Sequence, residues 1–379
     1  MQAGAKKFIK GLVIGLTLGM ASTIVTADFN RAMDALGSGD YTIALQELKP
    51  LAEQGAAEAQ FNLGVMYENG QGIPQNYAQA VNWYRKAAEQ GYAEAQFNLG
   101  GMYGNGLGVL QDHNQAVNWY RKAADQGFGP AQHNLGFRYD NGLGAVQDYS
   151  QAAHWYQKAA KQGIAQAQLN LAGLYAKGRG IPQDFVQALH WNREAAKQGS
   201  TKAQFNLGDM YDSGQGVPQD YTQAVNWYRK AAGLGFGPAQ FNLGLMYEDG
   251  RGAPSDYAQA ASWYRKAADQ GFAVAQSNLA TLYVKGQGVL QDYTQAADWY
   301  RKAAMQNNVT AQFNLGLMYD DGAGVPKSNI DAHMWYNLAA SQGDKVAAEN
   351  RDLLAERMTP EKIAMAHALA REWAVKNRN

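Results

Sequence analysis

Apolar and polar positions recur along the chain with a period of 36 residues. The stretch AEAQFNLGVMYENGQG at Ala57–Gly72 returns almost unchanged as AEAQFNLGGMYGNGLG at Ala93–Gly108. Eight such units follow one another without insertion, each marked by one glutamine: Gln60, Gln96, Gln132, Gln168, Gln204, Gln240, Gln276 and Gln312. Identical neighbours predict identical stacking, so the chain is expected to form a solenoid in which each unit covers the apolar side of the next.

The first half of each unit has the pattern of an amphipathic helix, here named helix A. In the first unit Ala59, Leu63, Met66 and Tyr67 follow one another at helical spacing and share one face. Two glycines end this helix in every unit, and a glycine after a helix adopts the left-handed conformation that costs other residues roughly 1–2 kcal/mol. The pairs are Gly70/Gly72, Gly106/Gly108, Gly142/Gly144, Gly178/Gly180, Gly214/Gly216, Gly250/Gly252, Gly286/Gly288 and Gly322/Gly324.

The second half of each unit predicts another helix, named helix B. It starts at a residue of strong N-cap type, one of Asn76, Asp112, Asp148, Asp184, Asp220, Asp256, Asp292 and Ser328. Seven of the eight caps have glutamine three residues later, which is the capping-box arrangement. Trp83 and Tyr84 are expected on its packing face, and Gly91 ends it. The terminating column is glycine except at Asn307, which also tolerates a left-handed bend.

A small residue occupies the middle of every helix A. The column reads Gly64, Gly100, Gly136, Ala172, Gly208, Gly244, Ala280 and Gly316. Glycine within a helix costs roughly 0.5–1 kcal/mol, so its recurrence predicts a close approach of helix B.

The 36-residue unit resembles the Sel-1-like repeat, a relative of the tetratricopeptide repeat. Its pattern AQFNLG, MY, GVPQDY, NWYRKAA and QG runs over about Phe29–Gly343, with departures at Trp191-Asn192, Ser277 and Lys327–Asp331. The resemblance implies an all-α fold, an α/α solenoid of tandem 36-residue helix-turn-helix repeats. We expect a shortened N-terminal capping repeat at 28–56, eight repeats at 57–343 and C-terminal capping helices at 344–379.

The first 27 residues have the order of a secretory signal peptide. Three lysines, of which Lys10 is the last, precede the apolar stretch Gly11–Ala21, and small residues follow at Val25–Ala27. We expect cleavage after Ala27 and a periplasmic or secreted protein. An uncleaved membrane anchor is disfavoured because the apolar run is short and broken by glycines, so no stable membrane insertion is expected after cleavage.

Charge and cysteine content narrow the possible functions. The chain has 33 basic and 33 acidic residues, and loss of the signal peptide removes three lysines and no acids. This balance argues against a nucleic-acid partner, which clustered cations would bind. The absence of cysteine excludes disulfides and thiolate chemistry. A family branch linked to β-lactam cleavage is rich in disulfides, so that activity is not carried over to this chain.

No residue constellation predicts catalysis or a cofactor. The six histidines are scattered, and none pairs with another at the spacing of a zinc-protease helix. The glycine-rich loops follow helices and lack a phosphate-binding lysine, so they are interpreted as turns. The WYRKAA segment is interpreted as a core-facing aromatic pair beside two solvated cations. We therefore expect a protein that is not an enzyme, holds no cofactor or metal, and is a monomer.

Helix A supplies the expected binding surface, because the resemblance implies that helix A lines the concave side. Variable columns on it describe an apolar strip edged by carboxylates, which would suit an extended or helical protein segment and would select a basic one. The candidate residues are Phe61, Phe97, Phe137, Phe205, Phe241, Leu245, Phe313, Glu68, Asp140, Asp212, Glu248 and Asp320. The alternative for the phenylalanine column, given equal weight, is that these rings complete the core between adjacent A helices.

The leading functional hypothesis is an exported scaffold for protein–protein interaction, in envelope assembly, signalling or host contact. One alternative is an envelope enzyme that acts on a cell-wall or β-lactam substrate. The other is a carbohydrate- or lipid-binding module that uses the aromatic strip.

Overall fold

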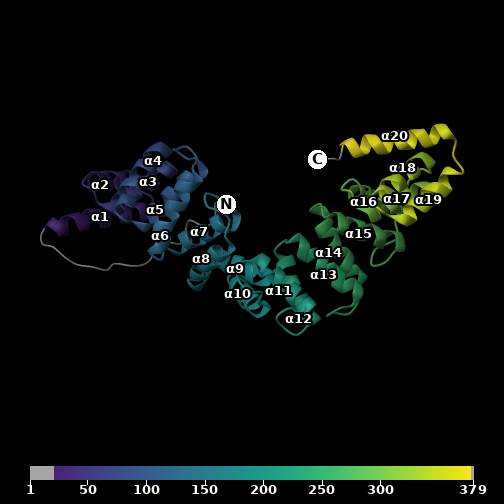
Figure 1. The fold of residues 1–379 in the computed structure, drawn as a ribbon, viewed down its shortest axis with the longest axis horizontal. Coiled ribbons are helices and arrows are strands. Elements are labelled where there is room, and N and C mark those ends of the chain that lie inside the picture. The colour runs from purple at the N-terminus through teal and green to yellow at the C-terminus, as the bar shows by residue number, and fades with distance from the viewer. Residues whose placement is uncertain (1–20, 377–379) are drawn as a thin grey trace. The chain divides into compact units, whose positions relative to one another are not determined.

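The structure is a computed structural model, and it describes residues 21–376. This part of the chain contains helices and no strand, as Figure 1 shows. The helices are α1 (Ala21–Ser38), α2 (Tyr41–Glu53), α3 (Ala57–Asn69), α4 (Tyr77–Glu89), α5 (Ala93–Asn105), α6 (His113–Asp125), α7 (Gly129–Asn141), α8 (Tyr149–Lys161), α9 (Ala165–Lys177), α10 (Phe185–Lys197), α11 (Thr201–Ser213), α12 (Tyr221–Gly233), α13 (Gly237–Asp249), α14 (Tyr257–Asp269), α15 (Ala273–Lys285), α16 (Tyr293–Ala304), α17 (Val309–Asp321), α18 (Asn329–Ser341), α19 (Lys345–Ala355) and α20 (Pro360–Lys376).

The helices form hairpins that stack in chain order within two compact units. One unit holds the described residues to Ala167 together with Arg179–Ile181, and the other holds Gln168–Gly178 and the described residues from Pro182. In the first unit α3 packs on α4 and α4 on α5; in the second α11 packs on α12 and α12 on α13. The all-helical α/α solenoid expected from the sequence is confirmed.

The two glycines after helix A serve different purposes. Gly106 closes α5 in the left-handed conformation, with φ of 69°, and its N–H donates to the carbonyl of Met102. Gly108 also has positive φ, and a Cβ there would lie 2.4 Å from the backbone of Tyr77 in the preceding helix B. The second glycine therefore lets successive repeats approach, which the terminator prediction did not include.

The N-caps of helix B are confirmed, but the capping-box prediction is wrong in its second half. Asp220 accepts a hydrogen bond from the backbone N–H of Gln223 at 3.0 Å. In a full capping box the Gln223 side chain would accept from the N–H of Asp220. That N–H instead donates to the carbonyl of Tyr211 at the end of α11, at 2.9 Å. A carbonyl in the last turn of α11 thus satisfies the group that the glutamine was expected to satisfy.

The small residue in helix A receives the ring of a buried tyrosine. Tyr84 is fully buried on α4, and a Cβ on Gly64 would lie 2.7 Å from its ring. The same relationship holds between Gly208 and Tyr228, where the distance would be 2.4 Å. The predicted close approach of the two helices is confirmed, and a specific ring causes it.

The glutamine column joins each repeat to the one before it. Gln60 is 4% exposed, and its amide donates to the carbonyl of Ala52 in α2 at 3.0 Å. Its side-chain oxygen accepts from the amide of Gln90, the C-cap residue of α4, at 2.8 Å. One buried side chain thereby links three helices. The same two bonds form at Gln96, Gln132, Gln240, Gln276 and Gln312.

The ends of the chain differ from the repeats. α1 begins at Ala21, ahead of the cleavage site predicted after Ala27, and residues 1–20, which hold most of the predicted signal peptide, lie outside the described residues. At the other end α19 and α20 both follow the last repeat, and α20 starts at Pro360 after Thr359.

Candidate partner-binding surface

The outer side of helix B is held by contacts within the scaffold. The ammonium of Lys86 lies 3.9 Å from the ring centroid of Trp83, and Arg85 donates to the hydroxyl of Tyr103 in the next repeat at 3.1 Å. Tyr84 is buried as predicted, whereas Trp83 is only half-buried and lies under its lysine. The two cations of WYRKAA therefore contact protein groups and are not simply solvated.

The phenylalanine column on helix A packs within the scaffold. Phe61 is half-buried, and its ring lies 5.9 Å from that of Tyr84 in its own repeat and 5.2 Å from that of Tyr92 at the start of the next. The four equivalent rings are also half-buried, and each lies 5.6–5.9 Å from the tyrosine of its own helix B: Phe97, Phe205, Phe241 and Phe313. These rings therefore complete the core, and only the exposed part of each ring could contact a partner.

Phe137 stands apart from that column. It lies on α7 one turn after the column position, it is 44% exposed, and the equivalent residue in the preceding repeat is Gly101. A Cβ on Gly101 would meet a single atom within 4 Å, the hydroxyl oxygen of Tyr120 at 3.7 Å. Phe137 thus presents a large exposed ring at a position that is glycine in the preceding repeat. Leu245, at the same position of α13, is half-buried against the core.

Three of the five predicted carboxylates bind the buried tyrosine of their own repeat. The Tyr84 hydroxyl donates to Glu68, the Tyr156 hydroxyl to Asp140 at 3.2 Å, and the Tyr264 hydroxyl to Glu248 at 2.5 Å. Burial and then the facing carboxylate raise the pKa of Tyr84 well above its ordinary value. Each of these carboxylates therefore fixes the tyrosine of helix B against helix A. Its second oxygen is the atom that a partner could contact.

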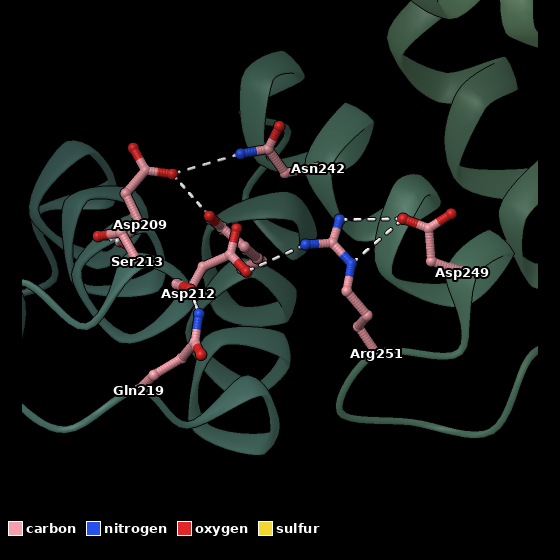
Figure 2. Close-up of polar contacts among 8 residues, drawn as sticks. Asp209, Asp212, Ser213, Gln219, Asn242, Asp249 and Arg251 are labelled. Carbon is pink, nitrogen blue, oxygen red and sulfur yellow. Dashed lines mark hydrogen bonds and ion pairs between the residues drawn. The ribbon is translucent and has the colours of Figure 1, made fainter.

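In α11 the arrangement changes because Asp209 stands where other repeats have an apolar or small residue. Tyr228 donates to Asp209 at 2.6 Å. Asn242 donates to the same oxygen at 3.3 Å, as Figure 2 shows. Burial is the largest cause that raises the pKa of Asp209 above its ordinary value; Asp212 adds to it, and the Tyr228 and Asn242 hydrogen bonds oppose it.

Asp212 does not accept the Tyr228 hydrogen bond, which goes to Asp209, and instead it pairs with Arg251 of the next repeat. Arg251 donates to Asp212 at 3.4 Å and to Asp249 at 3.0 Å (Figure 2). Its guanidinium thus bridges the ends of α11 and α13. Sequence reasoning named Asp212 but missed Asp209, Asn242 and Arg251. The sequence did contain a signal for Asp209: it is the charged residue at a position where the other seven repeats have an uncharged one.

The last predicted carboxylate, Asp320 on α17, also forms an ion pair. Arg357, between α19 and α20, lies 3.4 Å from it. The hydroxyl of Tyr336 is buried, and within residues 21–376 it has no hydrogen-bond partner. Burial and then Asp320 and Asp321 raise the pKa of Tyr336 above its ordinary value.

The structure places every predicted site residue on a helix A. Those of the first unit lie on α3, α5 and α7, and those of the second on α11, α13 and α17. Within the described range, no three metal-ligating side chains gather in a group, and no helix is long and apolar enough to cross a membrane.

The tandem hairpins, their glycine turns and their tyrosine-filled interiors define a repeat protein of the α/α solenoid class. The chain belongs to the Sel1 repeat family: the Sel1 repeat matches eight consecutive segments, residues 57–92, 93–128, 129–164, 165–200, 201–236, 237–272, 273–308 and 309–344. Proteins of this family are generally scaffolds for protein interaction, and the fold is typically non-catalytic.

Two solved structures are similar over most of the chain. One is c5321, described as a protective antigen of uropathogenic Escherichia coli strains with an SLR fold; it is 32% identical over 94% of this chain and 93% of its own, with a TM-score of 0.55. The other is a Sel1 repeat protein from Oxalobacter formigenes, 37% identical over 82% of this chain and 90% of its own, with a TM-score of 0.65. No protein with a curated description matches the chain.

Proposed function

We propose that this protein is an exported, non-catalytic scaffold that captures another protein on the helix-A surface of its repeats. This helix-A surface comprises the twelve candidate residues predicted from the sequence. The observation that carries the proposal is Phe137, a large apolar side chain that is 44% exposed while the other rings of the surface pack into the core. Aromatic side chains, phenylalanine included, are enriched in the buried centres of protein interfaces.

The partner is a basic segment. In the first unit Glu68 and Asp140 edge the strip that contains Phe137, and each keeps one oxygen beyond its tyrosine bond. At the start of α3 burial, followed by Glu94, raises the pKa of Glu58, so two carboxylates lie close enough to repel each other. A lysine or arginine of a partner would relieve this repulsion and would be steered toward the surface.

The protein acts outside the cytoplasm as a monomer, in the periplasm or beyond it. The lysines and apolar run of residues 1–27 support export. N-terminal sequencing of the protein recovered from the periplasm checks this part, with Asp28 as the expected first residue. Light scattering of the purified protein checks its oligomeric state.

The capture proposal is tested by photo-crosslinking in the native envelope. A benzophenone amino acid at position 137 is expected to give discrete protein adducts, identified by mass spectrometry. The matched control carries the same group at Leu110, which is 91% exposed but lies in a loop after helix A. Equal adducts at both positions, or none at 137, would contradict capture on this surface.

Alanine variants then locate the surface in each unit. Phe137→Ala in the first unit, and Phe205→Ala, Phe241→Ala and Leu245→Ala in the second, are expected to weaken capture at unchanged helix content. Unchanged capture by all four would place the binding surface elsewhere. A β-lactam hydrolysis assay on the mature chain separates the scaffold from the alternative of an envelope enzyme, since turnover would contradict a non-catalytic scaffold.

A further inference from the structure

The C-terminal helix α20 closes the apolar side of the last hairpin. Ala366 and Ala370 on α20 are buried in the same cluster as Trp335 on α18. The rings of Trp335 and Trp373 lie 6.0 Å apart in an edge-on arrangement. The small side chains of Ala366 and Ala370 let α20 pack close to α18. This contact between the two helices is called the α18–α20 seam.

A histidine occupies an apolar column in this seam. Its equivalents in the seven preceding repeats are all aliphatic: Val81, Val117, Ala153, Leu189, Val225, Ala261 and Ala297. His333 is 2% exposed, and its Nδ1 has no hydrogen-bond partner among the described residues. A buried polar atom without a partner costs about 1–3 kcal/mol, so packing alone does not account for the histidine.

His333 faces a second histidine and a cation. The ring of His367 on α20 lies 5.2 Å from that of His333. Arg351 and Asp352 on α19, which form an ion pair with each other, also act electrostatically on His333. Burial, followed by His367 and Arg351, lowers the pKa of His333 to about 4, and Asp352 only partly opposes this.

We propose that α20 is a proton-operated latch: uptake of a proton by the His333–His367 pair releases α20 from α18 and exposes the apolar side of the last hairpin. Release removes the two obstacles to the charge that α20 imposes, because His333 becomes solvated and His367 moves away with its helix. The exposed face would carry Trp335 and the other buried side chains of α18, which α20 keeps covered at neutral pH.

The sign and the size of the effect follow from the pKa of His333. A histidine of depressed pKa stabilises the docked state above its ordinary pKa of about 6.5, and that stability declines as the pH falls toward the docked value. With a docked pKa of about 4, the equilibrium constant for release rises about 20-fold between pH 7 and pH 5. This window lies above the titration of ordinary carboxylates.

The test uses the full chain, which has no cysteine of its own. Ala370→Cys places one thiol on the buried side of α20, and Ala368→Cys places one on its exposed side as the matched control. The ratio of their labelling rates by a thiol reagent cancels the pH dependence of the thiol. The ratio is expected to rise about 20-fold from pH 7 to pH 5.

Histidine variants show whether the pair is responsible. His333→Val, the residue of the same column in other repeats, is expected to give a low ratio that is independent of pH. His367→Gln is expected to give a smaller rise than the parent, because one of the groups that depress the pKa of His333 is gone. A parent ratio that stays constant, a full rise in His333→Val, or an unaltered rise in His367→Gln would overturn the latch.

Discussion

The buried side-chain oxygen of Gln204 lacks a hydrogen-bond donor because Leu234 stands where other repeats have a glutamine. Gln240 in the next repeat accepts from Gln270 at 2.8 Å, 30 residues later. At the equivalent position Leu234 is 63% exposed and offers no donor. Gln204 is 8% exposed, and its Oε1 has no partner within residues 21–376.

Leu234→Gln is therefore expected to stabilise the repeat at 201–236. A buried acceptor without a partner costs about 1–3 kcal/mol, and the new amide would recover part of this. Native-state hydrogen exchange of the α11 and α12 amides measures the local free energy of opening, which should rise by about 1 kcal/mol. Leu110→Gln, an exposed leucine far from the column, is the control. Equal effects of both substitutions would show that a more polar surface alone is responsible.

Two adjacent glycines of α5 should respond oppositely to alanine. A Cβ on Gly100 would lie 2.9 Å from the ring of Tyr120, whereas one on Gly101 has only an ordinary contact at 3.7 Å. Gly100→Ala should destabilise the repeat by about 1–3 kcal/mol through overpacking. Gly101→Ala should stabilise it by about 0.4–1 kcal/mol, because alanine favours the helix. Hydrogen exchange of α5 gives both values, and a loss of stability in both variants would contradict the ring as the cause.

The sequence was sufficient for the parts of the fold that depend on local physics. Glycine at helix ends, N-caps and the small residue opposite Tyr84 each follow from a residue type at a fixed position, and each is present in the structure. The role of Gly72 was not predictable in the same way. Its positive φ follows from the turn, but its contact with Tyr41 depends on how the preceding hairpin docks.

That second role predicts a difference between two left-handed glycines. Gly91 has φ of 92°, and a Cβ added there would meet no atom within 4 Å, so Gly91→Ala should cost only about 1–2 kcal/mol of backbone strain. Gly108→Ala adds a clash with the backbone of Tyr77 and should cost about 1–3 kcal/mol more. Urea denaturation of both variants measures the difference in the free energy of unfolding. Equal losses would show that the close approach of the repeats at Gly108 does not contribute to stability.

The candidate surface was harder to predict than the fold. Helical spacing places Phe61 and Glu68 on helix A, but it does not reveal that Tyr84 packs against the first and donates to the second. Both residues therefore serve the tyrosine of their own repeat as well as any partner. The size of Phe137 in a variable column points to it as a candidate, but its exposure of 44% is known only from the structure.

The charge of Asp209 predicts a pH-dependent loss of stability in the second unit. Burial raises the pKa of this carboxyl above its ordinary value, although Tyr228 and Asn242 donate to it. A raised folded pKa means that the stabilising contribution is complete below the unfolded pKa and is lost as the pH rises through the folded value.

Asp209→Asn removes this titration and keeps an oxygen that can accept from Tyr228. The variant should therefore gain stability relative to the parent as the pH rises from 4 to 7, and the two proteins should be closest at the acidic end. Hydrogen exchange of α11 at matched pH values measures the difference. Asp269→Asn is the control, because Asp269 is an exposed carboxylate on α14 of the same unit and is not among the groups that shift the pKa of Asp209. A difference between parent and Asp209→Asn that does not depend on pH would mean that the carboxylate is solvated well enough to ionise at no cost to the fold.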